Sequence, residues 1–162
     1  MVKFYEGIKQ DLILYARQLG WFHATPTQQG SHKKITDQVV PKSRLEKVVE
    51  NGGSPLMPEV GEAIYLVHYW NDLGLITAGP MGPVAISSQE VIAWQQGSQL
   101  DLSAWEFSSL IQMSRSYLSS MHLASDPACP PPYGNPINEF DRSVLSKRVS
   151  DAFKSLLMAR KP

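Results

Sequence analysis

The chain contains 162 residues, of which 43% are hydrophobic and 19% are charged, and its fifteen basic residues balance its fifteen acidic ones. This balance excludes a histone-like binder of polyanions and disorder driven by net charge. The single cysteine, Cys129, excludes an internal disulfide and a zinc site built from several cysteines. The longest apolar runs are about five residues, far below the roughly 18 of a transmembrane helix. We therefore expect a soluble, intracellular protein with no membrane contact.

Charged residues divide the chain into three parts. Residues 1–50 carry eight basic and five acidic residues, residues 51–138 one basic and seven acidic, and residues 139–162 six basic and three acidic. This pattern predicts either association of opposite charges or the ordinary placement of acids at helix starts and bases at helix ends. Ten serines lie between residues 87 and 120, which favours helix faces that contact other proteins without burying charge.

Residues 1–57 are predicted to form an N-terminal helix and a linker arm. Apolar residues recur at helical spacing over residues 4–19, which predicts an amphipathic helix that ends at Gly20. Residues 21–42 are rich in polar residues and predict a long loop. A short helix is expected over residues 43–50. Its inward-facing residues are expected to be Leu45, Val48 and Val49.

Residues 58–123 are predicted to form a central helical body. Apolar residues at helical spacing predict three helices, at about residues 58–73, 87–96 and 103–120. Apolar residues on two sides of the first of these helices indicate that it is packed from two directions. The core of this body is expected to contain four large aromatic residues, Trp70, Trp94, Trp105 and Phe107.

Two capping boxes and one connector add local detail to this body. Ser87 and Glu90 form one Ser-x-x-Glu pattern, and Ser103 and Glu106 form another, so each pair predicts the start of a helix. This capping role explains the two glutamates better than a catalytic pair does. Residues 75–85 contain so many glycines and prolines that we expect a connector without regular structure.

Residues 124–162 are predicted to form a proline-rich rod and a C-terminal helix. Three consecutive prolines favour an extended polyproline II segment, and Asn138 is expected to cap a helix over about residues 139–158. The broad apolar stripe of this helix must be buried against the body or a neighbouring subunit. The residues predicted to bind partners are Pro130, Pro131, Pro132, Tyr133, Phe140, Val149, Phe153 and Leu156. The expected fold class is therefore all-α, a small helical body with N-terminal and C-terminal helical arms.

No group of residues predicts a catalytic centre, and we expect neither a cofactor nor a metal ion. His23 and His32 share the polar loop and come nearest to a metal site. Cys129 has prolines and Asp126 as neighbours, and we expect no nearby cation or helix start that would activate a thiolate, so the thiol should be structural or inert. The helix pair after residue 87 is reminiscent of a helix-turn-helix, but its second helix offers only Arg115 as a base, so we do not expect nucleic acid as a partner.

A block of residues 70–118 combines an aromatic helix, a Gly-Pro connector, and a polar helix start that leads to a second helix closing in Tyr-Leu. These elements are Tyr69-Trp70, Gly79-Pro80-Met81-Gly82-Pro83, Ile86-Ser87, Ile92-Ala93-Trp94, Leu102-Ser103, Glu106-Phe107, Ile111 and Tyr117-Leu118. This block resembles one found in small bacteriophage morphogenesis proteins, which are similar to the tail assembly chaperone group. The resemblance covers about a third of the chain, implies no catalytic residues, and implies a protein that works through helical contacts with other phage proteins.

These features together predict a non-enzymatic bacteriophage structural or assembly protein of the virion, the tail or the head-tail junction. Its partners would be other phage structural proteins in a homo- or hetero-oligomer, in the host cytoplasm during assembly or in the virion. A transient tail assembly chaperone is one alternative. A soluble adaptor that presents Pro130–Tyr133 to a WW-type module is a second, and a small enzyme that uses Cys129 or a histidine is a third.

Overall fold

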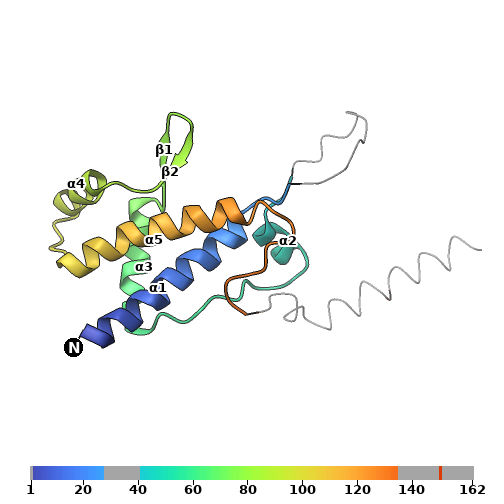
Figure 1. Cartoon of the computed structure of the whole chain (residues 1–162), viewed down its shortest axis with the longest axis horizontal. Coiled ribbons are helices and arrows are strands. Elements are labelled where there is room, and N and C mark those ends of the chain that lie inside the picture. The colour runs from blue at the N-terminus through green and yellow to red at the C-terminus, as the bar shows by residue number, and fades with distance from the viewer. Residues whose placement is uncertain (1, 28–40, 135–149, 151–162) are drawn as a thin grey trace, which may run out of the picture.

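The computed structural model describes residues 2–27, 41–134 and 150, and these residues are mainly helical (Figure 1). The elements in chain order are α1 (Val2–His23), α2 (Arg44–Glu50), the 3-10 turn η1 (Gly61–Ala63), α3 (Ile64–Leu73), β1 (Thr77–Gly79), β2 (Gly82–Val84), α4 (Ser88–Ser98) and α5 (Ala104–Leu123). The mainly helical class is confirmed. Apart from residue 150, the predicted C-terminal helix lies outside the described residues, and so do its proposed partner-binding residues Phe140, Val149, Phe153 and Leu156, as well as Asn138 and His32.

Helices α1 and α5 lie side by side and pack more extensively than any other pair of elements (Figure 1). Leu12 and Ala16 of α1 are buried in one cluster with Leu110, Met113 and Tyr117 of α5. Helix α3 also packs against α5 and brings a fully buried tryptophan, Trp70, into this cluster. We expected α1 to belong to an arm; its apolar stripe is instead buried in the same core as α3 and α5.

Gly20 lies inside α1, whereas we expected it to end the helix. The helix continues for three more residues, to His23. A Cβ atom at Gly20 would collide with the backbone oxygen of Tyr117, so the absence of a side chain allows the two helix backbones to approach closely. This glycine therefore marks a close approach of α1 to α5, and the prediction of a helix end there was wrong.

A second, smaller cluster joins the end of α1 to α2. Trp21, Phe22 and Ala24 are buried together with Ala124, which follows α5. Ser43 caps α2 in a capping box with Glu46, which suits the predicted start of this helix. Leu45 and Val48 pack against the second cluster, but Val49 is 58% exposed, so the inward position expected for Val49 was wrong.

A β-hairpin occupies part of the segment that we expected to lack regular structure. Strands β1 and β2 pair antiparallel with Thr77 opposite Val84 and Gly79 opposite Gly82. Pro80 supplies the fixed φ that suits the first turn position, and Gly82 adopts a φ of +125° that favours glycine. The glycines and prolines that seemed to exclude a strand pair therefore form its turn.

The remaining helices follow the predictions closely, with shifted ends. The capping boxes of Ser87 with Glu90 and of Ser103 with Glu106 are confirmed. Helix α3 begins at Ile64 after the 3-10 turn, α4 continues past Gly97 to Ser98, and α5 ends at Leu123. Of the four expected core aromatics, Trp70 is fully buried and the other three, Trp94, Trp105 and Phe107, are half-buried.

Candidate interaction surface

One segment of the chain carries almost no charge. Residues 75–100, which contain β1, β2 and α4, include a single charged residue, Glu90. We call this part of the molecule the low-charge lobe. In Figure 1 it lies on one side of the α1–α5 pair, and its hairpin projects away from the helices. Depletion of charged residues is a compositional mark of protein–protein interface cores.

The base of the hairpin is anchored to α5 by a buried hydroxyl group. Ser114 is fully buried; its Oγ donates a hydrogen bond to the Leu75 oxygen (2.6 Å) and accepts one from the Ile86 nitrogen (2.9 Å). The indole nitrogen of Trp70 donates a second hydrogen bond to the Leu75 oxygen (3.0 Å). Both ends of the segment that carries the hairpin are therefore fixed to the core.

The outer part of the lobe exposes apolar side chains. Met81, at the turn of the hairpin, is fully exposed, and Val84 of β2 is 43% exposed. Ile92 of α4 is also exposed. Pro83 has no backbone N–H, so it cannot donate a hydrogen bond to a strand added beside β2. Contact through the side chains of the lobe therefore suits it better than strand addition at β2.

The single charged residue of the lobe has a structural role. Glu90 accepts hydrogen bonds from the backbone nitrogen and the hydroxyl of Ser87 (both 2.7 Å) and interacts with the Thr77 side chain of β1. These hydrogen bonds hold the pKa of Glu90 below its usual value. The carboxylate thus ties α4 to the hairpin.

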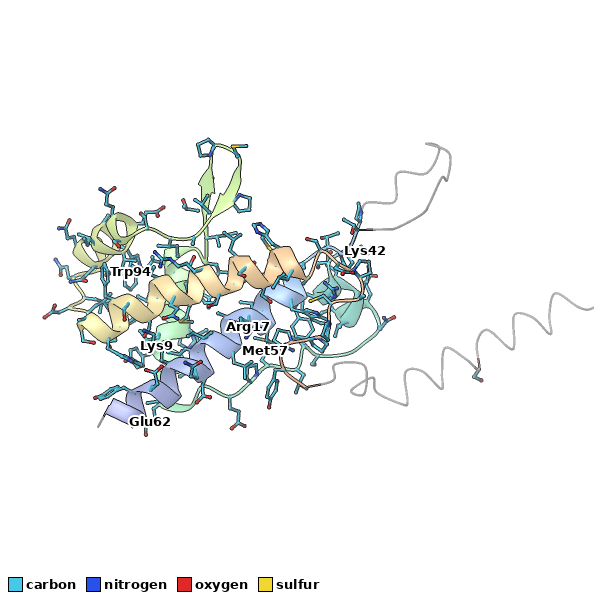
Figure 2. The ribbon with its side chains drawn as sticks, in the orientation of Figure 1. Lys9, Arg17, Lys42, Met57, Glu62 and Trp94 are labelled. Carbon is cyan, nitrogen blue, oxygen red and sulfur yellow. The ribbon has the colours of Figure 1, made fainter. Side chains whose placement is uncertain are left out.

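Helix α4 joins the lobe to the body through aromatic side chains. The Trp94 ring lies 5.4 Å from the Tyr69 ring of α3, and Figure 2 labels Trp94 on the side of α4 that faces the body. Val91 of α4 is fully buried and lies in the main cluster with Ile86. Trp94 therefore packs at the junction of lobe and body, between α4 and α3.

The proline-rich segment is bound to the body through a buried amide. The Gln18 side chain of α1 donates to the backbone oxygens of Leu56 (2.9 Å) and Tyr133 (3.1 Å), and its oxygen accepts from the Tyr133 nitrogen (3.0 Å). Trp21 adds a hydrogen bond from its indole nitrogen to the Cys129 oxygen (3.0 Å). Pro131 and Pro132 are half-buried, whereas Pro130 and the Tyr133 side chain are exposed. The backbone of the predicted recognition motif is therefore docked on its own chain.

Cys129 lies closer to a cation than its sequence neighbours suggest. It lines a pocket of about 500 Å³ together with Trp21, Arg44 and Lys47. The Arg44 guanidinium, however, stacks 4.6 Å from the centre of the Trp21 ring and donates hydrogen bonds to the backbone oxygens of Ala124 and Asp126. Burial lowers the pKa of Arg44. The expectation of no nearby cation was wrong, and the cation itself is bound to backbone groups.

The histidines of the described chain are dispersed. His23 forms a 2.7 Å hydrogen bond with the Tyr117 hydroxyl, and burial lowers the pKa of His23. His68 and His122 are exposed on other helices. Within residues 2–27 and 41–134, no three His, Cys, Asp or Glu residues are grouped so that they could hold a metal ion.

The Glu106 carboxylate forms hydrogen bonds at the start of its own helix, α5, and with α3. It accepts from the Ser103 nitrogen (2.7 Å) and from the Tyr65 hydroxyl (2.8 Å). Burial by itself would raise the pKa of Glu106, but the hydrogen bonds from Ser103 and Tyr65 give a net lowering. Burial, with the hydrogen bond to Glu106, raises the pKa of Tyr65 to about 12. Glu106 and Glu90 therefore each serve a capping box.

The sequence did not predict the buried hydrogen bonds of three polar residues, Ser114, Gln18 and Arg44. Ser114 occupies a position in the apolar stripe of α5, and a hydroxyl group in such a stripe is a usable signal for a buried hydrogen bond. Gln18 and Arg44 carry no comparable signal, because their partners are backbone groups far away in the sequence.

None of the helices that the structure describes combines the length and the apolar character needed to cross a bilayer. Comparison with known proteins found no matching family model, no matching curated protein and no matching solved structure.

Proposed function

We propose that this chain is a non-enzymatic structural or assembly protein that binds neighbouring proteins through the low-charge lobe. The observation that carries the proposal is the combination of a firmly anchored base and an exposed apolar tip. Ser114 and Trp70 fix the base of the hairpin, and Met81 at its turn is fully exposed. Exposed apolar groups on a charge-depleted surface are typical of protein interaction sites.

The bacteriophage part of the proposal rests on the resemblance of residues 70–118 to small phage morphogenesis proteins. This block includes β1, β2 and α4, together with most of α5. On this proposal the partners are other phage structural proteins, and the chain acts in the host cytoplasm during assembly or in the virion. A transient tail assembly chaperone would use the same lobe but would leave before the particle matures.

An adaptor that presents Pro130–Tyr133 is the second candidate function. The exposed Tyr133 side chain favours it. The hydrogen bonds between Gln18 and the Tyr133 backbone count against it, because a WW-type groove binds a free polyproline II segment. On this candidate, Tyr133→Ala would abolish capture of a WW module, whereas the main proposal predicts no effect on assembly.

Site-specific photo-crosslinking in cells that produce the particle tests the main proposal. A photo-reactive residue at Met81 should crosslink to a structural protein of the particle, whereas the same residue at exposed Glu62, outside the lobe, should crosslink much less. A crosslink that persists in the purified particle supports a resident component, and one found only before maturation supports the chaperone. Equal labelling at the two positions, or none at Met81, would contradict the proposal.

A further inference from the structure

An open groove of about 740 Å³ lies along α5, on a surface formed with α1 and outside the low-charge lobe. Its apolar lining residues are Phe107, Ile111 and Leu123. Its polar lining consists of Arg17, Arg115, one glutamine and four serines, among them Ser119. None of these residues is acidic. Figure 2 labels Arg17 on the part of α1 that lies next to α5.

Two arginines line the groove, and one of them, Arg115, comes from the most acidic part of the sequence. Arg115 is the single basic residue of residues 51–138, and it faces this groove together with Arg17. Both side chains are exposed, and neither guanidinium has an ion pair or a hydrogen bond with a described residue. Two cations without a counter-charge among the described residues favour an acidic occupant.

Apolar and polar lining residues occupy different stretches of the groove along α5. Its apolar residues Phe107 and Ile111 lie towards the start of the helix, and Leu123, which is 65% exposed, lies at the end. Arg115 and Ser119 lie between them. From Phe107 to Leu123 the helix axis rises by about 24 Å, which matches roughly four to five turns of a second helix.

We propose that this groove binds an acidic amphipathic helix of a partner protein. Apolar side chains at the two ends of that helix contact half-buried Phe107 and exposed Leu123, and Asp or Glu side chains near its middle pair with Arg115 and Arg17. Helix-in-groove binding uses apolar anchors one or more turns apart, and the arginines set the register and the charge preference. This binding is independent of the contact proposed for the low-charge lobe.

Two other occupants fit the groove less well. Residues 139–162 of this chain, or of a second copy, carry six basic and three acidic residues, so their net charge has the same sign as the arginines. A phosphate backbone would pair with the arginines but would leave the exposed Leu123 side chain without an apolar contact. The pattern of charge and apolar surface therefore favours the acidic helix.

Fluorescence anisotropy with the full chain tests the proposal. The probe is a labelled synthetic helical peptide of about 18 residues, with leucines in its first and last turns and two glutamates between them. A matched peptide has lysines in place of the glutamates. We expect saturable binding of the glutamate peptide below about 1 mM and at least about tenfold weaker binding of the lysine peptide.

Charge-reversal variants locate the binding site. The double variant Arg17→Glu/Arg115→Glu should bind the glutamate peptide at least about tenfold more weakly and should gain affinity for the lysine peptide. Lys47→Glu on α2 makes a charge change of the same kind away from the groove and should leave the binding unchanged. Circular dichroism and the unfolding midpoint of each variant show whether the fold is retained.

Several results would overturn the proposal. These are no saturable binding of the glutamate peptide, equal affinity for the two peptides, or unchanged binding by the double variant. Displacement of the glutamate peptide by a peptide of residues 138–162 would assign the groove to this chain's own sequence. Displacement by duplex DNA would assign the arginines to phosphate. None of these outcomes bears on crosslinking at Met81, so the two proposals can fail separately.

Discussion

The α1–α5 interface and the low-charge lobe differ in which side chains they bury and which they expose. In the interface, buried polar groups have partners within the chain: the Ser120 hydroxyl donates to the Arg17 oxygen (2.7 Å), and His23 bonds to Tyr117. In the lobe, the apolar side chains of Met81 and Val84 are exposed.

This contrast separates what the chain needs in order to fold from what it presents to other molecules. Polar groups that are satisfied in the interior add specificity to a fold, whereas apolar groups left in solvent add nothing to its stability. Changes at the interface should therefore alter the free energy of unfolding, and changes at the tip of the lobe should alter association alone.

The largest effect is expected at the helix crossing. Gly20→Ala should lower the free energy of unfolding by about 3 kcal/mol, because the new Cβ collides with the Tyr117 carbonyl and the helices must separate. Gly7→Ala is the matched control in the same helix. A Cβ there meets nothing within 4 Å, so this substitution should raise the free energy of unfolding, by at most about 1 kcal/mol. Urea unfolding measures both. Similar effects of the two substitutions would contradict the close approach at Gly20.

The anchor between body and lobe should have the next largest effect. Ser114→Ala should lower the free energy of unfolding by about 2 kcal/mol, because it leaves the Ile86 nitrogen buried without its hydrogen-bond partner. Hydrogen exchange should show faster exchange at Ile86, while amides at the centre of α1 keep their protection. Ser108→Ala on the exposed face of α5 is the control and should change stability little. An unchanged exchange rate at Ile86 would show that Ser114 does not hold the hairpin.

A smaller effect is expected from the titration of His23. Burial lowers the pKa of His23, so the unfolded chain binds a proton first as the pH falls through about 6.5. The stability contributed by neutral His23 is fully present above that pH and is lost as the pH falls towards the lowered pKa. Unfolding free energies at pH 8 and 5.5 should therefore differ in the wild type and differ less in His23→Gln. If the free energy of unfolding changes equally with pH in the wild type and in His23→Gln, the pH effect comes from a group other than His23.

The smallest effect on stability is expected at the tip of the lobe. Met81→Ser should change the free energy of unfolding by less than about 0.5 kcal/mol, because this side chain is fully exposed. Met113 of α5 is the buried counterpart. Met113→Ala should lower the free energy of unfolding by about 3 kcal/mol, because it leaves a cavity in the core. Thermal unfolding measures both. A large loss for Met81→Ser would mean that the hairpin turn packs against the chain, and the contrast between the two regions would fail.

Local sequence signals predicted the local structure well. Each capping box requires only a serine and a glutamate three residues later, so Ser87 with Glu90 and Ser103 with Glu106 located the starts of α4 and α5. The helix periodicity of α1 was equally clear. Periodicity shows that a face must be buried but not against what, which is why α1 was assigned to an arm and not to α5.

Features that depend on distant residues could not be predicted in the same way. Gly20 carries the same signal whether it ends a helix or lies against Tyr117, and only the packing distinguishes the two. Gln18 bonds to Leu56 and Tyr133, which are far away along the chain. The hairpin was missed because glycines and prolines were counted as breakers, although Pro80 and Gly82 are the residues that its turn requires.

Methionine oxidation in the native assembly tests the central claim, that the low-charge lobe is a contact surface, most directly. Peroxide oxidation followed by mass spectrometry compares exposed Met81 with fully buried Met113 in the isolated chain and in the assembled state. The account predicts that Met81 oxidises quickly in the isolated chain and is strongly protected in the assembly, while Met113 oxidises slowly in both. Equal oxidation of Met81 in the two states would contradict it.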